Sequence, residues 1–159
     1  MSRFSKFLKQ SLLAAAILVS ASLAVAVSTK DCPLPAGAQE AAYPDDIPQS
    51  VLQEFRVHVP KIAGIGERFS ATDVVTANLP SRRLIFVRHL GPKWVIAYEH
   101  GGRGYHEHVI AYLLDAANGD ANLTFNIVAL PETVCRAASS WLTGDSPSSS
   151  LPGRAARDW

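Results

Sequence analysis

The sequence predicts an α+β fold, in which a four-stranded antiparallel meander packs against an N-terminal helix and a short C-terminal helix. Three observations support this prediction. Four runs of seven to ten residues, rich in β-branched and aromatic side chains, follow one another with short turn signals between them. A segment with helical periodicity precedes these runs, and a second such segment follows them.

The N-terminal helix is expected within PQSVLQEFRVHV, residues 48–59. Asp45 or Asp46 can cap its start, and a proline is tolerated in a first helical turn. One face would carry the apolar side chains Val51, Leu52 and Phe55. The segment becomes β-like toward its end, which favours a short helix.

The four expected strands cover residues 84–90, 93–100, 105–114 and 122–130. Glycine, proline and asparagine residues separate them, as is typical of the turns in a meander. Continuous apolar stretches such as 94–97 indicate that both faces of the sheet are covered, because a one-faced sheet alternates cleanly. After Pro131, the segment ETVCRAASSWL predicts the C-terminal helix.

The N-terminus has the organisation of a secretory signal peptide. Three basic residues are followed by an uncharged stretch, 11–27, which contains the small-x-small triplet Ala24-Val25-Ala26. We therefore predict cleavage after Ala26, although an uncleaved membrane anchor is the alternative. The stretch is near the lower limit for a spanning helix, which needs roughly 20 residues.

The remaining chain divides into three parts by composition. Residues 27–44 are rich in alanine and proline and are expected to form a flexible N-terminal arm, and 45–143 to form a single α+β domain. Residues 144–159 are rich in serine, proline and glycine and are expected to be disordered, because such a segment buries too little apolar surface.

The charge of the mature chain excludes some partners. The whole chain has 15 basic and 14 acidic residues, and the predicted signal peptide removes three basic ones, leaving 12 against 14 and a net charge of −2. This balance predicts no nucleic-acid partner, and cleavage would leave no stable membrane span. We expect a periplasmic or secreted protein whose partner is a protein or small ligand of that compartment.

Cys32 and Cys135 are the two cysteines of the chain. In an oxidising compartment such a pair is usually a structural disulfide. The alternative is a reactive thiol, but the sequence has no C-x-x-C motif to favour it. We predict a bond that ties the N-terminal arm to the C-terminal helix.

The stretch YEHGGRGYHEH, residues 98–108, is the densest polar segment of the predicted sheet. A two-residue turn would place Glu99, His106 and His108 on one face, and Tyr98, His100, Tyr105 and Glu107 on the other. An odd loop would instead shift the register by one residue and bring His100 beside His106 and His108.

Each register predicts a different group of potential metal ligands, with zinc as the candidate ion. The first register gives two histidines and Glu99, and the second gives three histidines. Polar residues are also common at strand ends beside a turn, so structural or solvent-exposed histidines are the interpretation that we favour. A recognition surface is the next alternative, and its residues would be Tyr98, His100, Arg103 and Tyr105.

No catalytic motif such as HExxH or G-x-S-x-G occurs in the chain. The leading hypothesis from sequence is therefore a small exported binding module without catalytic activity or a required cofactor, acting as an inhibitor, envelope accessory or ligand carrier. The alternatives are a metal-dependent or acid–base enzyme centred on residues 98–108, and a structural interaction module.

Overall fold

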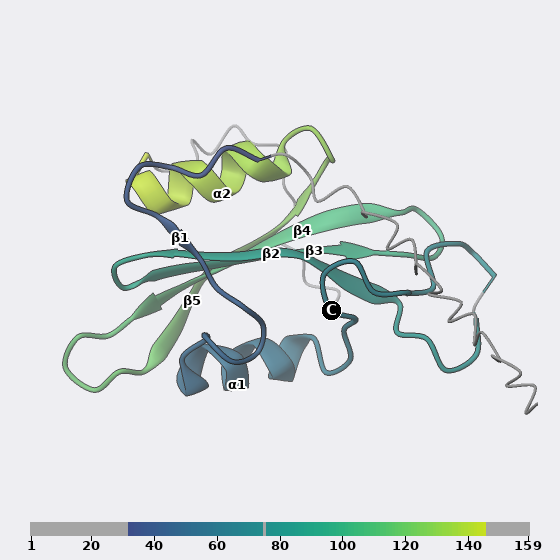
Figure 1. The fold of residues 1–159 in the computed structure, drawn as a ribbon, viewed down its shortest axis with the longest axis horizontal. Helices are drawn as coiled ribbons and strands as arrows, with labels where there is room; N and C mark the ends of the chain where they lie inside the picture. The colour runs from purple at the N-terminus through teal and green to yellow at the C-terminus, as the bar shows by residue number, and fades with distance from the viewer. Residues whose placement is uncertain (1–31, 75, 146–159) are drawn as a thin grey trace, which may run out of the picture.

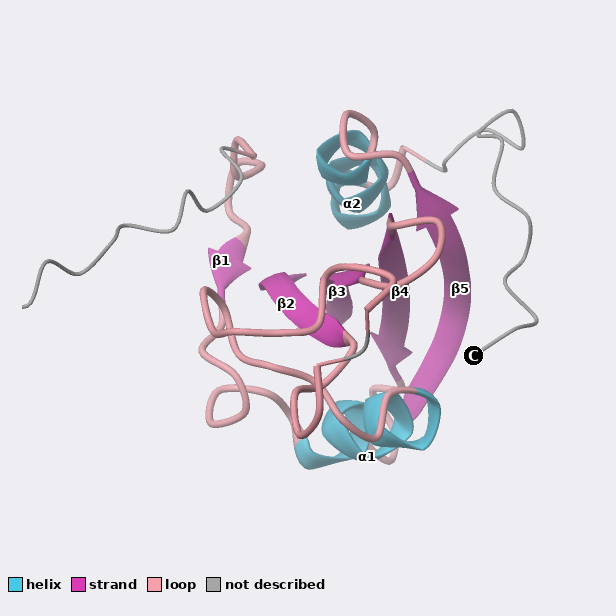
Figure 2. Ribbon diagram, turned by 90° about the vertical axis from the view of Figure 1, so that its right-hand side faces the viewer, coloured by secondary structure: helices cyan, strands magenta, loops and turns pink. Residues whose placement is uncertain are grey.

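A computed structural model of the protein describes residues 32–74 and 76–145. It confirms the α+β fold: an antiparallel sheet lies between two helices, with α1 on one face and α2 on the other (Figure 1). The end-on view in Figure 2 shows the same three layers. The predicted signal peptide, residues 1–26, and the tail from residue 146 lie outside the described residues.

The sheet has five strands in the order β1-β2-β3-β4-β5, and not the four that the sequence predicted. Their bounds are Gln39–Glu40, Arg82–Leu90, Lys93–His100, His106–Leu114 and Ala121–Ala129. The additional strand, β1, pairs with the end of β2. A strand of two residues has no hydrophobic period, so the sequence pattern could not reveal it.

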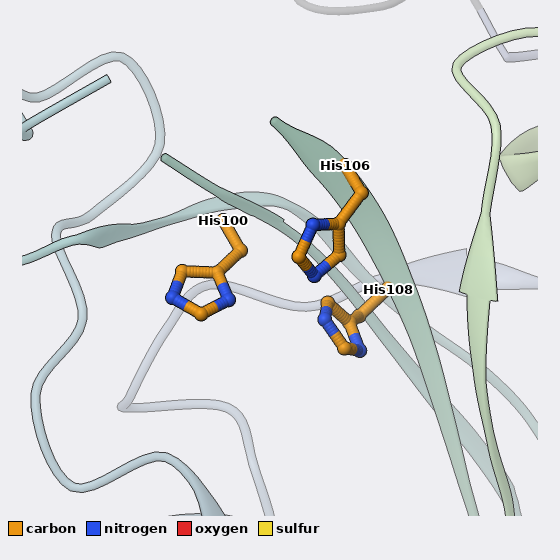
Figure 3. Close-up of side chains that lie close together, drawn as sticks. All are labelled: His100, His106 and His108. Carbon is orange, nitrogen blue, oxygen red and sulfur yellow. The ribbon is translucent and has the colours of Figure 1, made fainter. Parts of the chain in front are cut away.

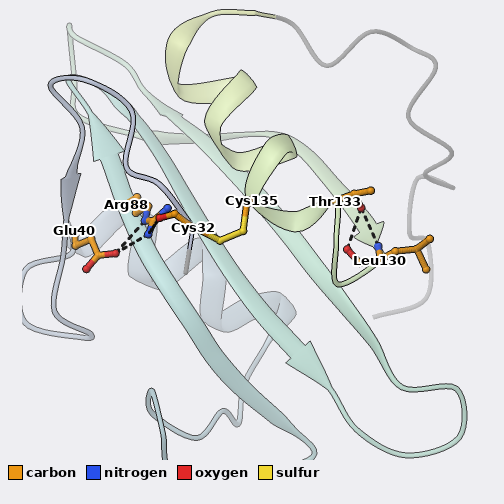
Figure 4. The surroundings of a disulfide bond; sticks show 6 residues. All are labelled: Cys32, Glu40, Arg88, Leu130, Thr133 and Cys135. Atoms are coloured by element: carbon orange, nitrogen blue, oxygen red, sulfur yellow. Dashed lines mark hydrogen bonds and ion pairs between the residues drawn. A yellow bond between two sulfur atoms is a disulfide. The ribbon is translucent and has the colours of Figure 1, made fainter. Parts of the chain in front are cut away.

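Residues 32–44, for which the composition predicted a flexible arm, contribute β1 and part of the core. Cys32, Ala38 and Ala41 are buried there. Cys32 is bonded to Cys135, which confirms the predicted disulfide (Figure 4). Within the same segment Glu40 pairs with Arg88 at 2.8 Å, as Figure 4 also shows.

Helix α1, Gln49–His58, includes residues 55–58, whose side chains favour a β-strand in the sequence. Its buried residues are Val51, Leu52 and Phe55, as the apolar spacing predicted. Packing of this face on the sheet outweighs the weak helix preference of the valine near its end. Helix α2, Val134–Thr143, ends at Gly144, which adopts a left-handed conformation with φ 88°.

Two hydrophobic cores lie on the two faces of the sheet. The core beneath α1 contains Phe55, Ile96, Tyr98 and Tyr112, and the core beneath α2 contains Val95, Ala97, Val109 and Ala138. Successive residues of β3 therefore enter different cores, which explains why its apolar run is continuous. Among the described residues, no helix has the length and apolar character needed to cross a membrane.

Candidate metal centre

The register of the β3–β4 hairpin determines which polar side chains meet. The loop between the strands spans residues 101–105, and His100 pairs with His106 while Tyr98 pairs with His108. This is the odd-loop register, so these residues share the α1 face of the sheet. Glu99 lies on the opposite face of the sheet. The predicted ligand group of Glu99, His106 and His108 is therefore wrong, because the Glu99 carboxylate does not lie beside the two histidines.

The odd loop is held in place by a segment that is distant in sequence. A Cβ atom on Gly101 would lie 2.0 Å from the carbonyl oxygen of Ser70, so only glycine fits there. The Gly101 amide donates to Ser81 at 2.8 Å. Gly102 and Gly104 have φ angles of 98° and 72°, which glycine adopts without strain. Gly102 and Gly104 thus allow the turn to form, and Gly101 allows the loop to pack closely against Ser70.

The three histidines form a compact cluster at the end of the hairpin. One potential ligand atom from each of His100, His106 and His108 lies within 4.8 Å of the others. Ring centroids are 4.7 Å apart for His106 and His108 and 5.1 Å apart for His100 and His106. Figure 3 shows the rings from the two adjacent strands gathered around a common space.

A backbone contact sets the tautomer of His106. Its Nδ1 lies 2.6 Å from the carbonyl oxygen of Gly104, which can only accept a hydrogen bond. Nδ1 must therefore donate, and in the neutral ring Nε2 keeps a free lone pair. A histidine that binds a metal commonly has its other nitrogen fixed in this way.

His108 is the buried member of the cluster, with 3% of its surface exposed. Its ring stacks on Tyr98 at a centroid distance of 4.7 Å and an angle of 3°. Burial lowers the pKa of His108 to about 4, with His106 acting in the same direction and Asn126 against it. The ring is thus neutral at neutral pH, which is the form that binds metals.

His100 is more accessible than His108 but is shifted in the same direction. Burial lowers its pKa, and the positive charge of Arg82 adds to this effect. Two of the three rings are thus disposed toward their neutral form.

One buried polar atom of the cluster, Nδ1 of His108, has no hydrogen bond to another described residue. Asn126 is the polar neighbour of His108, and a hydrogen bond from its side chain acts on the His108 pKa. Asn126 pairs with Ile110, which lies two residues along β4 from His108, so the side chains of Asn126 and His108 both lie on the α1 face. Unsatisfied buried polar groups are costly, and they concentrate at sites that bind ligands or carry out chemistry.

The four residues predicted as a recognition surface do not lie together. Tyr98 is 2% exposed and belongs to the core beneath α1, whereas His100 belongs to the cluster. Arg103 is exposed in the loop. Tyr105 donates from its hydroxyl to Glu99 at 2.6 Å, and so turns toward the other face of the sheet. The prediction that Tyr98 is accessible to a partner is wrong because α1 covers it.

Glu99 has a structural role in this arrangement. Its carboxylate accepts from Nε of Arg83 at 2.6 Å as well as from Tyr105. The guanidinium of Arg83 also lies over the ring of Phe69, 4.4 Å from its centroid. These contacts join β3 to β2 and to the segment that holds the hairpin loop, and they engage both carboxylate oxygens.

Sequence reasoning missed Arg82 and Asn126 as neighbours of the cluster. Both lie far from residues 98–108 in the chain and reach the histidines through strand pairing. Strand order and register were the missing information.

Comparison of this chain with known protein families, curated proteins and solved structures finds no match. Its function is therefore argued from the cluster itself, because a fold class alone supports no particular function.

Proposed function

We propose that this protein is an exported binding module whose ligand is a divalent transition-metal ion held by His100, His106 and His108. The observation that carries the proposal is the convergence of three imidazole nitrogens within 4.8 Å. The Gly104 carbonyl supports it by leaving Nε2 of His106 free to bind. This is the ligand-carrier form of the sequence hypothesis, with a metal ion as the ligand.

The cluster fits the coordination chemistry of zinc and its neighbours. Tetrahedral Zn–N bonds of ~2.0–2.1 Å place two ligand nitrogens about 3.3 Å apart. The most distant ligand atoms of the cluster, at no more than 4.8 Å, would need to approach by about 1.5 Å. The half-buried His100 ring would make this approach, because the Gly104 carbonyl holds the His106 ring and His108 is buried. Imidazole also suits copper and nickel, so the proposal concerns this class of ions.

An exported location agrees with the disulfide. A bond between Cys32 and Cys135 is compatible with an oxidising compartment. The composition of residues 1–26 supports secretion or release into a periplasm. We infer that metal binding takes place after export, in the mature chain.

Catalysis by the bound metal is the second candidate. Three histidine ligands leave a coordination position open for water or substrate, as in catalytic zinc sites. The two glutamates of the hairpin, Glu99 and Glu107, pair with each other on the opposite face of the sheet. Neither carboxylate is thus placed to act as a general base for a metal-bound water, and we rank binding above catalysis.

Metal analysis of the protein tests the proposal. The exported protein is recovered from cells that express the full chain without an affinity tag, and its metals are quantified by mass spectrometry. We expect about one transition-metal ion per chain, retained after dialysis against zinc-containing buffer. His106→Ala should lose it, since two imidazoles remain.

The matched control is His89→Ala, because His89 stacks on Trp94, 4.4 Å between centroids, and lies outside the cluster. This variant should keep its metal. A wild-type protein that binds no metal, or a His106→Ala variant that binds as much as the wild type, would overturn the proposal.

A further inference from the structure

Strand β2 carries three arginines, and they differ in their charge partners. Arg83 pairs with Glu99 at 2.6 Å, and Arg88 pairs with Glu40 at 2.8 Å. Arg82 forms no ion pair with any residue in the described part of the chain. A half-buried guanidinium without a carboxylate is the exception on this strand.

Arg82 lies beside the histidine cluster. It pairs with His100 across β2 and β3, so the two side chains share the α1 face at neighbouring positions. Burial raises the pKa of Tyr98 and lowers that of His108, and the nearby positive charge of Arg82 acts to lower both. Arg82 of β2, His100 of β3, and the two histidines of β4 therefore lie together at this end of the sheet.

A bound metal ion would create an unbalanced charge at this place. Neutral imidazoles contribute no negative charge, and a doubly charged ion would repel the guanidinium of Arg82. Three histidines also leave a tetrahedral metal with one open position. An oxyanion in that position would satisfy the metal and give Arg82 the anionic partner that it lacks among the described residues.

We infer that the metal ion held by the three histidines takes a small oxyanion, a carboxylate or a phosphate, as its fourth ligand, and that Arg82 binds the same anion. This inference rests on the proposed metal-binding function and names the ligand that completes the site. It predicts that metal and anion bind together, each strengthening the binding of the other.

Cobalt(II) provides the test, because its visible absorption reports both occupancy and coordination. The metal-free exported protein is titrated with Co²⁺ in perchlorate of constant ionic strength, then with acetate or with inorganic phosphate present. In the wild type, one of these anions should change the visible spectrum and tighten Co²⁺ binding about tenfold, within the usual range of coupling between sites.

Substitution of Arg82 should change the two affinities in opposite directions. Without an added anion, Arg82→Gln should bind Co²⁺ more tightly than the wild type, because the repulsion is removed. With the anion present, its gain should fall below about threefold. Arg82→Lys keeps the charge and should retain part of the gain. A purely structural role for Arg82 would weaken binding in both conditions.

Arg103→Gln is the matched control, since Arg103 is exposed in the hairpin loop and carries the same charge. It should behave as the wild type, and thermal unfolding checks that every variant is folded. If neither anion affects Co²⁺ binding, or if Arg82→Gln keeps the full gain, the inference is wrong while metal binding stands. If Co²⁺ does not bind at all, the proposed function itself fails.

Discussion

The buried imidazole of His108 should make the stability of the metal-free protein depend on pH. Its pKa is about 4 in the folded protein, against an ordinary value of 6.5. Between these values the unfolded chain takes up a proton that the folded protein does not. The free energy of unfolding therefore falls as the pH falls through this window, and no further loss arises from His108 below about pH 4.

The size of this effect follows from the shift. A difference of about 2.5 pKa units corresponds to about 3 kcal/mol between pH 7 and pH 4. Because His108 is only 3% exposed, solvent screening reduces this value little. Such a loss is a large part of the stability of a small domain, which is commonly ~5–15 kcal/mol.

Urea unfolding of the metal-free protein, followed by tryptophan fluorescence at several pH values from 7 to 4, measures the effect. His108→Gln removes the titrating group and should lose about 3 kcal/mol less than the wild type over this range. His89→Gln is the control and should follow the wild type. Parallel curves for the wild type and His108→Gln would refute the burial argument.

Three further outcomes are expected. Cys32→Ser, Cys135→Ser and the double variant should destabilise the fold equally, by up to ~4.7 kcal/mol for a loop of about 100 residues, and denaturant unfolding checks this; a double variant clearly worse than either single variant would contradict it. Mass spectrometry of the exported protein should find Val27 at its N-terminus, and a membrane-held chain that still begins with its first methionine would refute cleavage. Tyr105→Phe should cost about 1 kcal/mol, because it removes the hydrogen bond to Glu99; an unchanged unfolding midpoint would show that solvent replaces this contact.

The sequence was informative where a pattern extended over many residues. Residues 93–100 form β3 as predicted, and the continuous burial of this strand follows from the helices on both faces. Val51, Leu52 and Phe55 form the buried stripe of α1 as their spacing indicated. The apolar residues of these elements follow the spacing of a helix or a strand, so the elements can be recognised without knowledge of what packs against them.

The site was less predictable because its geometry depends on contacts between distant segments. The hairpin register was left open between two alternatives, and the docking of Gly101 against Ser70 accompanies the odd loop. Glu99 could not be assigned to its face without that register. Arg82 and Asn126 join the site only through strand pairing, for which a single sequence carries no local signal.

The most direct test of the metal centre is nuclear magnetic resonance of the histidine rings during a zinc titration. Labelled ring nitrogens of His100, His106 and His108 should shift together and saturate at one zinc per chain, with Nδ1 of His106 still protonated. His58 and His89 lie outside the cluster and should not change. Spectra in which the three rings do not respond, or in which all five respond alike, would contradict the account.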